Sequence, residues 1–235
     1  MNKKKLVVFS GAGMSAESGI QTFRDTGGLW EQYNVEDVAT YNAWIKNEVL
    51  VLDFYNQRRK QIMQAQPNEA HKMVAALAKD FDVQVITQNI DDLHERAGSK
   101  KVLHLHGEIM KGRSTANADL IYDLKSWEIK QGDTCALGSQ IRPHIVWFGE
   151  PVPEMKNAIL LAQEAAIFII IGTSLNVYPA ANLIHEVPHH VPKFLIDPGE
   201  FSLSSVPHLT IIKTTAVEGM KKLQLQLKKY LQENK

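Results

Sequence analysis

The chain has 235 residues, with 26 lysines and arginines balanced by 26 aspartates and glutamates, so its formal net charge is zero. This balance excludes a strong overall attraction to nucleic acid or to an anionic membrane surface, and we expect neither partner. The single cysteine, Cys135, allows no intrachain disulfide, and the apolar runs are too short for a signal peptide or a membrane span. A cytoplasmic location is therefore expected.

Short apolar runs of β type alternate with segments of helical spacing. The runs lie at Leu6–Phe9, Val83–Thr87, Ile167–Ile171, Lys193–Ile196 and Leu209–Ile212. Helices are predicted at Glu48–Ala65, Asn68–Lys79 (capped by Asn68), Pro153–Glu164, Pro179–Glu186 and Ala216–Gln232. This alternation predicts an α/β fold with a doubly wound parallel sheet.

Two segments depart from this alternation, approximately 27–73 and 107–140. We expect these two insertions to form a smaller second domain. The large domain then comprises approximately 1–26, 74–106 and 141–235, and the whole chain, 1–235, forms a single unit.

The first predicted strand ends in a loop of small residues, Gly11-Ala12-Gly13. Small residues leave backbone N–H groups open to a phosphate, as at the mouth of a dinucleotide-binding fold. The alternative is a plain turn, because the spacing is not the usual G-x-G-x-x-G.

Polar residues follow four further strand ends. They are Gln88-Asn89-Ile90-Asp91, the His104-Leu105-His106-Gly107 segment, Gly172-Thr173-Ser174 and Asp197. The carboxyl ends of parallel strands meet at one edge of a sheet, so these loops are expected to border one ligand crevice. The alternative for Asn89 and Asp91 is helix capping, and for Gly172–Ser174 an ordinary turn.

Among nine histidines, His106 is the candidate base. It follows a strand end, and Gly107 leaves room for another backbone beside it. His104 is expected to pack beneath the rim of the crevice. Six other histidines are expected at the surface, namely His71, His94, His185, His189, His190 and His208, and no histidine pair has a spacing that supports a zinc site.

Five ordered motifs resemble those of the sirtuins, the NAD-dependent protein lysine deacylases, and the resemblance covers essentially the whole chain. The motifs are Gly11-Ala12-Gly13-Met14-Ser15 with Ser18-Gly19-Ile20 and Phe23-Arg24, Thr87-Gln88-Asn89-Ile90-Asp91, Leu105-His106-Gly107, Val146-Trp147-Phe148-Gly149-Glu150, and Gly172-Thr173-Ser174 with Pro179-Ala180. The resemblance implies a Rossmann-like sheet and NAD bound between the two domains.

The resemblance also implies a role for each matching residue. His106 is the general base. The cofactor-binding residues are Gly11, Ala12 and Gly13 at the pyrophosphate, Phe23 and Arg24 over the nicotinamide ribose, Gln88, Asn89 and Asp91 in the nicotinamide pocket, and Thr173, Ser174 and Asp197 at the adenosine half, together with Ser15, Ile90, Gly172 and Ala216. The substrate backbone pairs with Val146, Phe148, Gly149 and Glu150. The implied products are free lysine, nicotinamide and O-acyl-ADP-ribose.

Tyr55 and Arg58 lie three residues apart in a predicted helix and so share one face. A phenol beside a guanidinium suits a carboxylate, and the pair resembles the signature of the sirtuin branch that removes succinyl, malonyl and glutaryl groups. Deacetylation is expected as well. The alternative is a solvated basic helix face that also includes Arg59 and Lys60.

The chain departs from the sirtuin pattern at the structural zinc. Thr134 and Leu137 stand where the later cysteine pair is expected, with Cys135 displaced by one position, and Ser114 stands near the first expected ligand. Hydroxyl and alkyl groups do not replace thiolates, so no zinc is expected. Gln21 and Asp197 stand where the family usually has proline and asparagine.

Two other functions remain open from the sequence. One is a protein mono-ADP-ribosyltransferase using the same NAD cleavage. The other is a non-catalytic sensor of NAD or ADP-ribose.

Overall fold

A computed structural model describes residues 3–22, 33–201, 203 and 205–233. Phe23 and Arg24, both expected to bind the cofactor, lie outside the described residues. Within the described part of the chain, no helix is both long enough and apolar enough to cross a membrane.

Six parallel strands form the main sheet. They are β1 (Lys5–Ser10), β2 (Asp82–Thr87), β3 (Val102–His104), β7 (Ile167–Ile171), β8 (Lys193–Ile196) and β9 (Leu209–Ile212). Their order in the sheet is β3-β2-β1-β7-β8-β9. From β1 the chain adds strands on one side (β2, β3) and later on the other side (β7, β8, β9), so the direction of winding changes between β1 and β7. A doubly wound sheet opens its ligand crevice at such a switch point. The predicted α/β class and parallel sheet are confirmed.

The central strand β7 is buried on both faces of the sheet. In β7, Ile167, Ile169 and Ile171 point to one core, while Phe168 and Ile170 point to the opposite core. All five side chains have no exposed area. This burial explains why the strand is a continuous apolar run rather than an alternating one.

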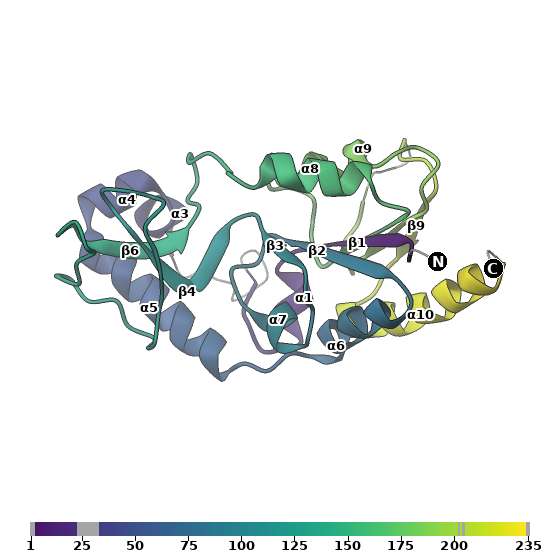
Figure 1. The fold of residues 1–235 in the computed structure, drawn as a ribbon, viewed down its shortest axis with the longest axis horizontal. Helices are drawn as coiled ribbons and strands as arrows, with labels where there is room; N and C mark the ends of the chain where they lie inside the picture. The colour runs from purple at the N-terminus through teal and green to yellow at the C-terminus, as the bar shows by residue number, and fades with distance from the viewer. Residues whose placement is uncertain (1–2, 23–32, 202, 204, 234–235) are drawn as a thin grey trace.

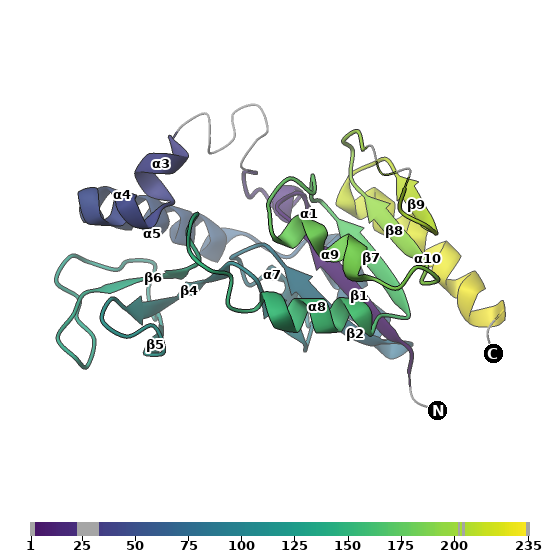
Figure 2. The same ribbon diagram turned by 90° about the horizontal axis from the view of Figure 1, so that it is seen from above.

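Helices cover both faces of the sheet (Figures 1 and 2). One face carries α6 (Glu69–Ala76), which continues into the 3₁₀ turn η1 (Leu77–Lys79), and α10 (Ala216–Glu233). The other face carries α8 (Met155–Gln163) and α9 (Leu183–Glu186), the latter preceded by the 3₁₀ turn η2 (Ala180–Asn182). Two one-turn helices, α1 (Gly13–Ala16) and α7 (Leu93–Arg96), follow β1 and β2. As predicted, Asn68 caps α6, accepting hydrogen bonds from the N–H groups of Ala70 and His71.

A second, smaller sheet lies beside the main one (Figure 2). Its antiparallel strands are β4 (Gly107–Ser114), β5 (Ile121–Asp123) and β6 (Ile141–Ile145), in the order β5-β4-β6. It packs against α3 (Val35–Val38), α4 (Tyr41–Lys46) and α5 (Glu48–Gln64) through a separate core that includes Val51, Tyr55, Ile109 and Trp147.

The expectation that His71 and His94 lie at the surface is wrong. Their side chains are 0% and 1% exposed, and their rings meet edge to face with centroids 4.9 Å apart. His71 lies on the inner face of α6 because it stands three residues before the buried Val74. Helical spacing therefore determines the burial of this polar side chain.

Candidate functional site

A cavity of about 570 Å³ opens at the carboxyl ends of the main strands and extends toward the smaller sheet. This volume lies within the range of about 300–1,000 Å³ typical of small-molecule sites. Every expected site residue that the structure describes lines this cavity: Gly11, Ala12, Gly13, Ser15, Tyr55, Arg58, Gln88, Asn89, Ile90, Asp91, His106, Val146, Phe148, Gly149, Glu150, Gly172, Thr173, Ser174, Asp197 and Ala216.

The loops after β1 and β7 are in direct backbone contact. Gly11 N–H donates to Ile171 O at 3.0 Å, and Gly13 N–H donates to Gly172 O at 2.8 Å. Gly172 has φ +63°, and a Cβ there would lie 2.2 Å from Met14 N. Glycine is therefore required for the loops to close on each other, which is a further reason for small residues here.

The loop after β2 is fixed by its own side chains. Asn89 Nδ2 donates to Gly11 O at 3.0 Å and to Ser15 Oγ at 3.1 Å, and Ser15 Oγ donates to Asp91 Oδ2 at 2.9 Å. Asp91 Oδ1 also accepts from Leu93 N–H, the first residue of α7, but the N-cap position of that helix is Asp92, which makes no side-chain capping bond. Burial raises the pKa of Asp91.

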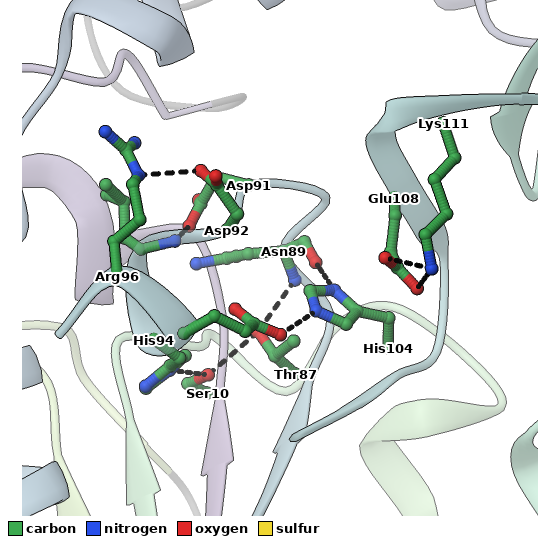
Figure 3. A network of polar contacts seen from close by, with 12 residues as sticks. Ser10, Thr87, Asn89, Asp91, Asp92, His94, Arg96, His104, Glu108 and Lys111 are labelled. Atoms are coloured by element: carbon green, nitrogen blue, oxygen red, sulfur yellow. Dashed lines mark hydrogen bonds and ion pairs between the residues drawn. The ribbon is translucent and has the colours of Figure 1, made fainter. Parts of the chain in front are cut away.

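A second layer of polar contacts supports this loop from below (Figure 3). Ser10 Oγ donates to Thr87 Oγ1 at 2.9 Å and lies 2.9 Å from His94 Nε2, and Thr87 Oγ1 accepts from Asn89 N–H. His104 Nδ1 donates to Asn89 O at 3.0 Å, while its Nε2 lies 2.8 Å from Glu95 Oε1. The expected position of His104 beneath the rim is confirmed.

His106 is oriented by a single defined hydrogen bond. Its Nδ1 lies 3.0 Å from Gln88 O, and because a carbonyl can only accept, Nδ1 carries the proton and Nε2 keeps a free lone pair. Burial lowers the pKa of His106, against a smaller opposing effect of the bond to Gln88. The imidazole is therefore neutral near pH 7 and can accept a proton at Nε2.

Gly107 brings a second backbone beside His106, as predicted. Gly107 has φ +83°, and a Cβ there would lie 2.1 Å from His144 O. The close approach lets Val146 N–H donate to His106 O at 3.0 Å. The segment 146–150 is thereby tied directly to the histidine.

Segment 146–150 is also held at its middle and at its carboxyl end. Phe148 N–H donates to Ala39 O at 3.0 Å, and the Glu150 carboxylate forms ion pairs with Arg142 at 2.7 Å and Arg113 at 3.2 Å. Glu150 Oε2 also accepts from Trp147 N–H, and the Arg142 guanidinium lies 3.2 Å from the centre of the Trp147 ring. Glu150 thus fixes the shape of the segment in addition to lining the cavity.

Tyr55 and Arg58 reach the cavity from α5, where they are 4% and 6% exposed. Burial lowers the pKa of Arg58 from 12.5 to about 10, and burial raises that of Tyr55. Arg58 Nη2 donates to Gln21 O at 3.0 Å and Nη1 to Gln61 Oε1 at 3.4 Å, both neutral acceptors. The alternative of a solvated basic face is wrong for Arg58 and Arg59, which is 0% exposed, and holds for the exposed Lys60.

Several lining residues were not anticipated. Trp147 stands inside a recognised motif, and Asn176, Val177 and Tyr178 follow β7 at the same strand end as Gly172, so position alone could have indicated them. Ile20 and Pro179 also stand inside recognised motifs. No motif indicated the other lining residues, which are Ala16, Glu17, Thr22, Ala39, Phe54, Ile62, Ile145, Val152, Ile196, Pro198, Gly199 and Thr215.

The described residues contain no group of three or more histidine, cysteine or acidic side chains arranged to hold a metal. Near the expected zinc position, Cys135 Sγ lies 3.2 Å from Ser114 Oγ and 3.1 Å from Ser139 Oγ. One thiol and two hydroxyls are not a donor set for tetrahedral zinc, so these residues do not fit that metal.

Comparisons with known proteins agree with this geometry. A family model described as "Sir2 family" matches residues 11–179. An "NAD-dependent protein deacylase" of Bacteroides thetaiotaomicron is 50% identical over 226 residues, covering 94% of this chain and 97% of that protein. A protein of the same name from Helicobacter pylori is 49% identical, covering 95% and 97%. A crystal structure of a Sir2 homologue in complex with NAD superposes with a TM-score of 0.86 at 38% identity, covering 97% of this chain and 91% of that one.

Proposed function

Because this chain belongs to the Sir2 family and is an NAD-dependent protein deacylase, we propose that it removes carboxylate-bearing acyl groups such as succinyl from protein lysines, and acetyl groups as well. The family, the enzyme class and the use of NAD agree with the prediction from sequence. The acyl preference and the role of each site residue are the proposal.

The residues of the cavity fit NAD. The closely packed loops around Gly13 and Gly172 present backbone at the switch point of the sheet, where a pyrophosphate is bound in folds of this type. Asn89 and Asp91 offer amide and carboxyl groups to a nicotinamide, and Asp197 lies at the end of β8 where it can accept hydrogen bonds from a ribose. When bound, NAD supplies the activated ribose that receives the acyl group.

His106 is the proposed general base. His106 lines the cavity, and the bond from Nδ1 to Gln88 O fixes the tautomer, so Nε2 is the nitrogen that can accept a proton from a ribose hydroxyl. The lowered pKa keeps the imidazole neutral at physiological pH. The segment tied to His106 through Val146 is the proposed partner of the substrate backbone.

One observation carries the acyl preference: a desolvated cation lines the cavity beside a phenol. Among the described lining residues, Arg58 is the single lysine or arginine, and Tyr55 lies on the same face of α5. Arg58 donates hydrogen bonds to Gln21 O and Gln61 Oε1, and the charge of Asp91 acts to raise its pKa against the larger effect of burial. An incoming carboxylate would neutralise this charge in a low-dielectric setting, where the interaction is strong.

Mass spectrometry of a reaction containing NAD and a succinyl-lysine or acetyl-lysine peptide tests the proposal. We expect a peptide lighter by one acyl group, nicotinamide and O-acyl-ADP-ribose, with faster turnover of the succinyl peptide. A peptide heavier by one ADP-ribose would support the ADP-ribosyltransferase. NAD binding without release of nicotinamide would support the sensor. The cytoplasmic location stays a prediction that rests on the single cysteine.

A further inference from the structure

Helix α5 carries a second pair of polar side chains, one residue further along than Tyr55 and Arg58. Asn56 and Arg59 are 7% and 0% exposed, and they face the smaller sheet rather than the cavity. A fully buried guanidinium is costly unless its hydrogen bonds are made. What Arg59 binds therefore indicates why the chain keeps it there.

Arg59 binds backbone carbonyls of two separate segments. Its Nε donates to Ile109 O at 2.6 Å, and its Nη1 donates to Trp127 O at 2.7 Å and to Asn56 Oδ1 at 2.8 Å. No ion pair of Arg59 with an acidic side chain occurs in the described part of the chain. The guanidinium thus joins α5 to β4 and to the insertion that follows β5.

Asn56 completes this connection with a pair of hydrogen bonds to one residue. Its Nδ2 donates to Ile129 O at 2.9 Å, and its Oδ1 accepts from Ile129 N–H at 2.9 Å. This is the pattern by which a neighbouring strand would satisfy the same peptide groups. The insertion segment around residues 127–129 is consequently bound to α5 through its backbone, with no requirement for a metal.

The Ile109 peptide extends the connection to the catalytic loops. Its C=O accepts from Arg59, while its N–H donates to Ile90 O at 2.8 Å, within the loop proposed to hold nicotinamide. Ile109 also lies three residues after His106 in the sequence. One residue, Ile109, therefore separates Arg59 from the loop that hydrogen-bonds the catalytic histidine.

We propose that Arg59 and Asn56 are positioning residues that hold the acyl-recognition helix α5 in register with His106, through the peptide groups of an insertion that has no structural zinc. The inference deepens the proposed function, because it concerns the same acyl pocket. A cavity wall displaced by about 1 Å can cost about a hundredfold in rate, so anchoring α5 on both sides of the pocket affects substrate binding directly.

Two variants of the full-length protein test this proposal. In Arg59→Lys a single ammonium group replaces the planar guanidinium and cannot donate hydrogen bonds to Ile109 O and Trp127 O with the same geometry. We expect the KM for a succinyl-lysine peptide to rise about tenfold or more, with the Kd for NAD, measured by calorimetry, unchanged within about twofold. Hydrogen exchange should become faster at residues 127–129. Gln57→Ala, at an exposed position of the same helix, is the matched control and should change none of these.

Asn56→Ala provides a milder perturbation that keeps the buried charge. We expect faster exchange of the Ile129 amide and a smaller rise in KM, with Gln57→Ala, an exposed neighbour, as its control. EDTA should change neither the melting temperature nor the activity of the wild-type protein. Unchanged KM and exchange in both variants would overturn the positioning role, and a loss of stability with EDTA would overturn the metal-free anchoring.

The outcome for the proposed acyl preference can be separated from this one. If the preference is wrong, the wild-type protein will not favour the succinyl peptide, yet Arg59→Lys will still raise the KM for the acetyl peptide and speed exchange at residues 127–129. If the positioning role is wrong, the wild-type preference will stand and both variants will keep the wild-type KM.

Discussion

Replacement of Arg58 by methionine removes the cation of the proposed acyl site while keeping most of the aliphatic volume of the side chain. The guanidinium is 6% exposed, and burial lowers its pKa from 12.5 to about 10, which corresponds to about 3 kcal/mol of disfavoured charge. At pH 7 the group nevertheless remains charged. It is therefore a desolvated cation that a ligand carboxylate would stabilise.

The magnitude follows from the strength of one charged hydrogen bond. Such a bond contributes about 1.5–3 kcal/mol, so Arg58→Met should lower kcat/KM for a succinyl-lysine peptide about ten- to a hundredfold. An acetyl group has no carboxylate to lose, so kcat/KM for an acetyl-lysine peptide of the same sequence should change by less than about threefold. The ratio of the two constants is the quantity to measure.

The assay follows nicotinamide release by chromatography for both peptides at saturating NAD. Lys60→Met serves as the control, because it removes a positive charge from the same helix at an exposed position. Tyr55→Phe should lower the succinyl rate less than Arg58→Met, since it removes one hydroxyl and no charge. Equal losses on both peptides in Arg58→Met would refute the reasoning and would assign Arg58 to the architecture of the cavity.

Three further predictions concern ionisation and backbone strain. Because burial lowers the pKa of His106, the acid limb of the pH profile of kcat/KM should lie below pH 6.5, and a limb above that value would contradict the assignment of a neutral base. His106→Ala should lower turnover about a hundred- to ten-thousandfold while NAD still binds. Burial lowers the pKa of His71 from 6.5 to about 4, so between these pH values the unfolded chain binds a proton that the folded state does not. The free energy of unfolding, measured with urea, should therefore be highest above about pH 6.5 and fall by up to about 3 kcal/mol as the pH drops toward 4. His71→Leu should flatten that dependence, and a slope equal to that of the wild-type protein would argue against it. Gly172→Ala places a Cβ 2.2 Å from Met14 N and should lower both the melting temperature and the affinity for NAD. Gly138→Ala, at φ +75° with no atom within 4 Å of the added Cβ, is the control for backbone strain alone. Equal losses in the two variants would exclude the proposed loop contact.

The strands and long helices could be predicted from sequence because apolar runs and helical spacing are local properties. The predictions for Ile167–Ile171, Lys193–Ile196 and Leu209–Ile212 match β7, β8 and β9 at both ends. The helix predicted at Ala216–Gln232 is α10, and its side chains Met220, Leu223 and Leu227 pack on the sheet. The short strands β3 and β5 have three residues each, too few to show a period.

The convergence of the site loops could also be predicted, because the carboxyl ends of parallel strands share one edge. Gln88, His106, Thr173 and Asp197 are far apart in the chain and yet line one cavity. The sequence did not indicate how these loops are fixed. Asn89 contacts Gly11, which follows a different strand, and His104 of β3 contacts Asn89 in the loop after β2. No local sequence pattern reveals contacts between residues that are so far apart in the chain.

The sequence by itself determined the fold class, the order of the elements and the set of residues at the strand ends, since each depends on spacing along the chain. Only the tertiary structure decided which polar side chains are buried. Four neighbouring polar residues of α5 look equivalent in the sequence. The structure places Tyr55 and Arg58 at the cavity, and Asn56 and Arg59 against the insertion. Burial of a charged side chain depends on what packs against it, and that is set by segments up to about 70 residues away, as for Arg59 and Trp127.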